Sequence, residues 1–95
     1  MVTIRVVVAG RVQSVGYRAW AERNARTLGL SGWVRNLHNG DVEALVLGAA
    51  EAVDQLTAWA HRGPSPARVD RVLFNDEPNT ENVDVSSGFR QRPTF

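Results

Sequence analysis

A short loop bounded by two glycines, residues 10–18, holds the groups in this chain best suited to chemistry. It reads Gly-Arg-Val-Gln-Ser-Val-Gly-Tyr-Arg. A valine-rich run of strand length precedes it, and apolar residues at helical spacing from Tyr17 to Leu28 follow it. The start of a helix offers unpaired N–H groups and the positive end of the helix dipole. Together with the forked guanidinium of Arg18, these groups predict a site for an oxyanion such as phosphate.

Two common nucleotide motifs do not match this loop. A P-loop has lysine and then serine or threonine after its second glycine, whereas Gly16 is followed by Tyr17 and Arg18. The chain has no lysine, and all eleven of its basic residues are arginine. The dinucleotide fingerprint requires three glycines, and this loop has two. A simpler alternative is a strand-to-helix connection in which Arg18 pairs with Glu22, one helical turn further on.

The elements that would position this loop can be read from the periodicity of the chain. Strands are predicted at residues 2–9, 33–37, 42–47 and 69–74, with a short last strand at 89–92, and helices at 17–28 and 50–62. Asn39-Gly40 predicts a hairpin with a type I′ turn, and residues 76–79, within the polar stretch 75–87, predict a loop. This order predicts an α+β, ferredoxin-like β-α-β-β-α-β sandwich. Two helices would cover one face of an antiparallel sheet of four to five strands, with the first and third strands adjacent at its centre.

Two motifs carry a resemblance to a known family. The loop resembles the signature of the acylphosphatases, roughly Gly-Arg-Val-Gln-Gly-Val-x-Tyr/Phe-Arg, and Gly-Trp-Val-Arg-Asn at residues 32–36 resembles their second motif. The similarity extends in length and element order over nearly the whole chain. It implies a single domain, residues 1–95, that hydrolyses the carboxyl–phosphate bond of acyl phosphates without a metal or other cofactor.

The resemblance also implies which residues do the work. Arg18 and Asn36 would be catalytic, with Asn36 orienting the attacking water. The substrate phosphate would be bound by the backbone amides and side chains of one run: Gln13, Ser14, Val15, Gly16, Tyr17 and Arg18. An acyl phosphate is a mixed anhydride with a good leaving group, so positioning and charge stabilisation can suffice. The alternative for Asn36 is a strand-end residue that bonds its own turn.

Ser14 departs from the family pattern, which usually has glycine at this position. If the loop requires a positive φ there, serine costs roughly 1–3 kcal/mol of local strain. This departure leaves a second hypothesis, a non-catalytic acylphosphatase-like domain that binds phosphate or another ligand for regulation. Phosphate binding without hydrolysis would distinguish it.

Composition excludes several other classes of function. The 95 residues carry a net charge of +1 and contain no cysteine, so disulfides, thiolate metal sites and cysteine catalysis are excluded. An RNA-recognition domain shares the strand order but stacks bases on aromatic side chains, and the two predicted central strands contain none. His38 and His61 share no metal-ligand spacing, and Asp41 and Glu43 are interpreted as solvated. We therefore expect a cytoplasmic monomer that acts on a small molecule, with no nucleic-acid partner and no membrane association.

Overall fold

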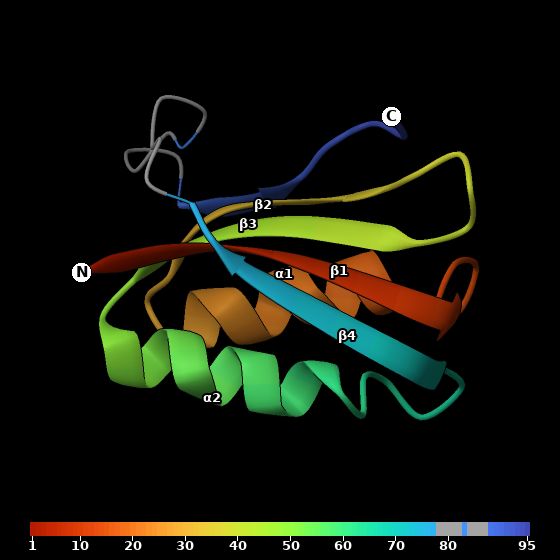
Figure 1. Cartoon of the computed structure of the whole chain (residues 1–95), viewed down its shortest axis with the longest axis horizontal. Coiled ribbons are helices and arrows are strands. Elements are labelled where there is room, and N and C mark those ends of the chain that lie inside the picture. Colours follow the sequence, from red (N-terminus) through yellow and green to blue (C-terminus); the bar gives the residue numbers. More distant parts are fainter. Residues whose placement is uncertain (78–82, 84–87) are drawn as a thin grey trace.

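In the part of the chain that the structure describes, residues 1–77, 83 and 88–95, two helices cover one face of a five-stranded sheet (Figure 1). The structure is a computed structural model. The elements in chain order are β1 (Val2–Arg11), α1 (Tyr17–Thr27), β2 (Ser31–Asn36), β3 (Val42–Gly48), α2 (Ala50–Ala60), β4 (Arg68–Asp76) and β5 (Phe89–Gln91). The predicted α+β arrangement and the order of its elements are confirmed.

The strands lie in the order β4-β1-β3-β2-β5. The first and third strands are neighbours at the centre, as predicted, and pair antiparallel from Val2↔Gly48 to Val8↔Val42. The sheet is mixed rather than wholly antiparallel, because β5 pairs parallel with β2. β4 and β5 lie at opposite edges of the sheet, and β5 runs in the same direction as β2.

Most predicted boundaries lie within a few residues of those observed, and β1 and β4 are longer than predicted. β4 continues to Asp76, so the prediction of a loop at residues 76–79 is wrong for its first residue. Residues 78–79 lie outside the described residues.

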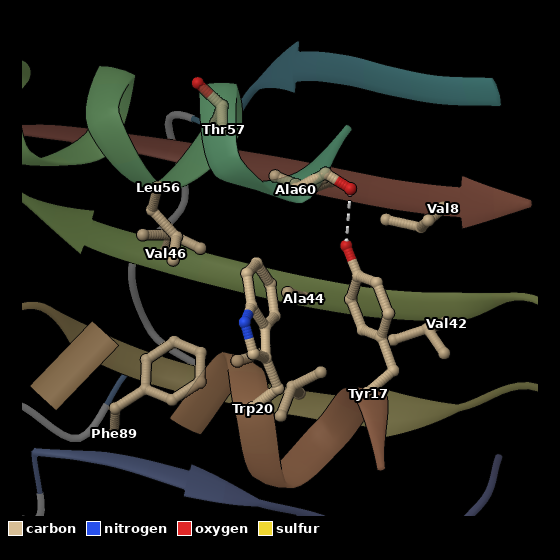
Figure 2. A pocket seen from close by; sticks show the side chains of 13 residues that line it. Val8, Tyr17, Trp20, Val42, Ala44, Val46, Leu56, Thr57, Ala60 and Phe89 are labelled. Carbon is tan, nitrogen blue, oxygen red and sulfur yellow. Dashed lines mark hydrogen bonds between the residues drawn. The ribbon is translucent and has the colours of Figure 1, made fainter. Parts of the chain in front are cut away.

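The core between the sheet and the helices fixes the start of α1. Alternate valines of β1 and β3 point toward the helices, as the period of two in a strand requires. Tyr17 inserts between the two helices, and its hydroxyl donates a buried hydrogen bond to the carbonyl of Ala60, 2.8 Å away, at the end of α2 (Figure 2). A small apolar cavity of about 30 Å³ remains beside the rings of Tyr17, Trp20 and Phe89. Burial raises the pKa of the Tyr17 phenol far above its ordinary value. The residue before Arg18 is therefore anchored in the core.

The opposite face of the sheet contains a buried carboxylate. The sequence favours a solvated Glu43, but only 5% of this residue is exposed. Its carboxylate accepts hydrogen bonds from Arg5 on β1 and from Arg35 on β2, whose Nε lies 2.8 Å from Glu43 Oε1. The guanidinium of Arg35 also lies over the ring of Trp33. That interpretation was wrong because strand pairing places both arginines beside Glu43 on the same face.

Candidate active site

The loop between β1 and α1 has two residues in the left-handed backbone region. Ser14 has φ 62° and Gly16 has φ 82°, and the residues between and after them do not share that conformation. Backbone that alternates in this way forms concave nests of N–H groups that bind anions. Gly16 is also the N-cap of α1, and no side chain caps the first turn of this helix. Val12, which is 1% exposed, anchors the loop in the core.

The β2–β3 hairpin lies at the same end of the sheet as this loop (Figure 1). Asn36 is the last residue of β2, so it lies at this end. Its turn is not the predicted type I′. The Leu37 N–H donates to the Asp41 carbonyl and the Gly40 N–H to the Leu37 carbonyl, at 2.8 and 3.2 Å, so three residues separate the paired ends. Gly40 has a positive φ of 99° and Asn39 does not. The Asn-Gly sequence is equally compatible with a three-residue loop that ends in a left-handed glycine.

One cavity joins the loop and the hairpin. It has a volume of about 160 Å³, well above the roughly 15 Å³ that one ordered water requires. Five of the residues predicted for the site line it, together with Val12, Ala19 and Gln91; the five are Ser14, Gly16, Tyr17, Arg18 and Asn36. Residues that are distant in sequence thus surround a space large enough for a phosphoryl group.

Two predicted residues do not line this cavity. Val15 packs against the hydrophobic core. The side chain of Gln13 is directed to the hairpin, where its Nε2 donates to the carbonyls of Leu37 and Asp41, at 2.7 and 2.9 Å. The loop therefore alternates between side chains that hold it in place and residues that line the cavity.

Arg18 and Asn36 line the cavity without being engaged by other side chains. Among the residues that the structure describes, neither side chain makes a hydrogen bond or ion pair with the protein. The alternative pairing of Arg18 with Glu22 is wrong, because Glu22 binds Arg26 at 3.3 Å and accepts a hydrogen bond from Gln91. The alternative for Asn36 is also wrong, since the side chain that bonds the turn is Asn39, whose Oδ1 accepts the N–H of Asp41 at 3.0 Å.

Sequence reasoning missed Gln91. It lies on β5, and the parallel pairing of β5 with β2 places it opposite Val34 at the cavity. Its Nε2 donates to Glu22 Oε1, 3.1 Å away on α1. A glutamine on a three-residue strand has no local pattern that could have revealed this position.

Other features of the described residues bear on what the site can bind. No group of three or more histidine or carboxylate side chains within the described ranges is placed to hold a metal ion. His38 and His61 are exposed. Neither α1 nor α2, the helices of the described part, has the length and apolar character needed to cross a membrane.

Comparisons with known proteins agree with this fold. The family model described as "Acylphosphatase" matches residues 4–90. The chain is 51% identical over 87 residues to an acylphosphatase of Azoarcus sp., an alignment that covers 92% of this chain and 85% of the relative. It is also similar to the crystal structure of the Bacillus subtilis acylphosphatase, with a TM-score of 0.88, 28% identity, and coverage of 97% and 99% of the two chains. The structure of an acylphosphatase from Coxiella burnetii has a TM-score of 0.86 and 37% identity, with coverage of 96% and 92%.

Proposed function

The chain belongs to the acylphosphatase family, and on that premise we propose that its cavity hydrolyses the carboxyl–phosphate bond of small acyl phosphates, giving a carboxylate and inorganic phosphate. One observation carries this proposal: a single cavity is lined by the β1–α1 loop, by Arg18 and by Asn36. The alternative of a non-catalytic regulatory domain is not favoured, because relatives that share about half of its residues over most of the chain are acylphosphatases.

The phosphoryl group would be bound by the loop. The amides of residues 13–18 donate to its oxygens, with Ser14 and Gly16 supplying the left-handed conformations that form the nest. The guanidinium of Arg18 binds two further oxygens and stabilises the charge that develops in the transition state. Because the described residues provide Arg18 with no ion-pair partner, its charge is available to the substrate.

Asn36 would orient the attacking water with its side-chain amide. The water oxygen bonds to phosphorus, the bond from phosphorus to the acyl oxygen breaks, and the electron pair leaves with the carboxylate. The proton of the water passes to a phosphate oxygen of the substrate. This reaction requires no metal, cofactor or nucleophilic side chain, since the leaving group is already a good one.

The proposal also covers the domain organisation, oligomeric state, cellular location and partners of the protein. We take residues 1–95 to act as one domain and as a monomer, because one chain supplies the β1–α1 loop, Arg18 and Asn36, the groups that the proposed reaction needs. The lack of cysteine agrees with a cytoplasmic location. The lack of aromatic residues on β1 and β3 disfavours nucleic acid as a partner.

Hydrolysis of benzoyl phosphate by the wild type, Arg18→Ala and Asn36→Ala, in buffer with EDTA, tests the proposal. We expect turnover by the wild type, and a loss of about 10²–10³ in kcat/KM for each variant. Arg23→Ala is the matched control, because Arg23 is exposed on the same helix and does not line the cavity, and it should keep wild-type activity. Phosphate binding without turnover by the wild type would instead support the regulatory alternative.

A further inference from the structure

We propose that Gln13 is a positioning residue, whose side-chain amide sets the place of Asn36 relative to the phosphate-binding loop. This inference rests on the proposed function and assigns a role to a side chain that does not line the cavity. Gln13 lies between buried Val12 and exposed Ser14, and its side chain is partly buried against the hairpin.

The amide of Gln13 bridges two parts of the chain that are far apart in sequence. Its Nε2 donates to the carbonyl of Leu37 at 2.7 Å and to the carbonyl of Asp41 at 2.9 Å. These two residues form the base of the hairpin loop, where the Leu37 N–H also donates to the Asp41 carbonyl at 2.8 Å. Both hydrogens of the Gln13 amide are therefore used at the point where β2 ends and β3 is about to begin.

This contact acts on the residue beside Leu37, which is Asn36. Within the part of the chain that the structure describes, Gln13 makes the only side-chain hydrogen bonds between the β1–α1 loop and the hairpin. Other contacts hold Asn36 from different directions: its carbonyl accepts the N–H of Phe95 at 3.0 Å, and it pairs with Val42 in the sheet. Those contacts fix Asn36 within the sheet, whereas Gln13 fixes it relative to the loop that would hold the phosphate.

The rate of the proposed reaction depends on the position of Asn36 relative to the phosphate-binding loop. Displacing a reacting group by about 1 Å can reduce the rate by about 100-fold. Loss of the Gln13 bridge should therefore lower kcat, because the water held by Asn36 no longer aligns with phosphorus. Phosphate binding should change little, since the loop amides and Arg18 remain in place.

Two variants test the role of the amide. Gln13→Met keeps the length of the side chain and removes both donors. Gln13→Glu keeps the shape but places a carboxylate against two carbonyl oxygens. We expect each to lower kcat by about 10–100-fold at pH 7, with the inhibition constant of inorganic phosphate changed less than about threefold.

The pH profile of Gln13→Glu separates positioning from a general loss of structure. A protonated carboxyl can donate one hydrogen bond to a carbonyl, and the neighbouring carbonyls should raise its pKa above the usual value of about 4.3. The kcat of Gln13→Glu relative to the wild type should therefore rise as the pH falls from about 7 to 4.5. The relative kcat of Gln13→Met should stay constant over the same range.

Asn39→Ala is the control within the hairpin. It removes the hydrogen bond from the Asp41 N–H to Asn39 Oδ1 and leaves the contacts of the β1–α1 loop unchanged. It should keep kcat within about threefold of the wild type. The inference is overturned if Gln13→Met keeps wild-type kcat, if phosphate inhibition weakens in proportion to kcat, or if Asn39→Ala is equally impaired. Failure of the proposed function would look different: Arg18→Ala and Asn36→Ala would then be as active as the wild type.

Discussion

Raising the pH above 10 should destabilise this protein through a single side chain, the phenol of Tyr17. The chain contains one tyrosine, no lysine and no cysteine. Among the side-chain types of this chain, tyrosine alone has an ordinary pKa, about 10, that lies between 9 and 12. In the folded protein this phenol is buried, donates to the Ala60 carbonyl, and has its pKa raised by desolvation.

The sign and size of the effect follow from this shift. The unfolded chain ionises Tyr17 near pH 10, whereas the folded chain keeps it neutral to a much higher pH. The stability contributed by the neutral phenol is therefore complete below pH 10 and is lost as the pH rises toward the folded pKa. Each pH unit above 10 should lower the free energy of unfolding by about 1.4 kcal/mol, so the loss at pH 11.5 should be about 2 kcal/mol.

Urea unfolding of the wild type and of Tyr17→Phe, at pH 8 and pH 11.5, measures this effect. The wild type should lose about 2 kcal/mol between the two conditions. Tyr17→Phe should be less stable at pH 8, because the Ala60 carbonyl loses its donor, but should change little with pH. Equal losses in the two proteins would refute the reasoning. So would a tyrosinate absorbance that appears near pH 10 while the protein is still folded.

Three further substitutions have defined outcomes. Ser14→Gly relieves a left-handed serine, so kcat for benzoyl phosphate should stay the same or rise; a large loss would show that the serine hydroxyl binds the substrate. Gln91→Leu removes one polar side chain from the cavity, so it should raise KM no more than about fivefold, the value of one hydrogen bond, and leave kcat unchanged. A collapse of kcat would contradict the assignment of the chemistry to Arg18 and Asn36. Glu43→Gln should lower the free energy of unfolding in urea by about 1–3 kcal/mol, because two arginines lose their buried partner; unchanged stability would show that the cluster contributes nothing.

Local patterns were sufficient to predict most of the fold. The 3.6-residue spacing from Tyr17 to Leu28 and the alternation in the strands depend on neighbouring residues, and both helices were confirmed. The parallel pairing of β5 could not be read this way, because β5 follows β4 in the sequence but lies at the opposite edge of the sheet, beside β2. The burial of Glu43 depends on the register between strands, which no single stretch reveals.

In the candidate site, too, local patterns predict some features, whereas others depend on contacts between residues that are distant in sequence. The loop glycine Gly16 has the left-handed conformation that its residue type favours, whereas Ser14 shares it against the preference of its type. The sequence does not show where the Gln13 amide points, since its partners, Leu37 and Asp41, are 24 and 28 residues away. Gln91 lines the cavity from β5, a strand whose sequence contains no recognisable motif.

Titration of the ¹⁵N-labelled protein with inorganic phosphate, followed by amide chemical shifts, tests the central claim most directly. If the loop and Arg18 bind the phosphoryl group, the largest saturable shifts should be those of the amides of residues 13–18. Arg18→Ala should weaken this binding at least tenfold, the value of about one charge-assisted hydrogen bond, and Asn36→Ala should leave it nearly unchanged. Shifts centred elsewhere on the fold, or equal binding by Arg18→Ala, would contradict the account.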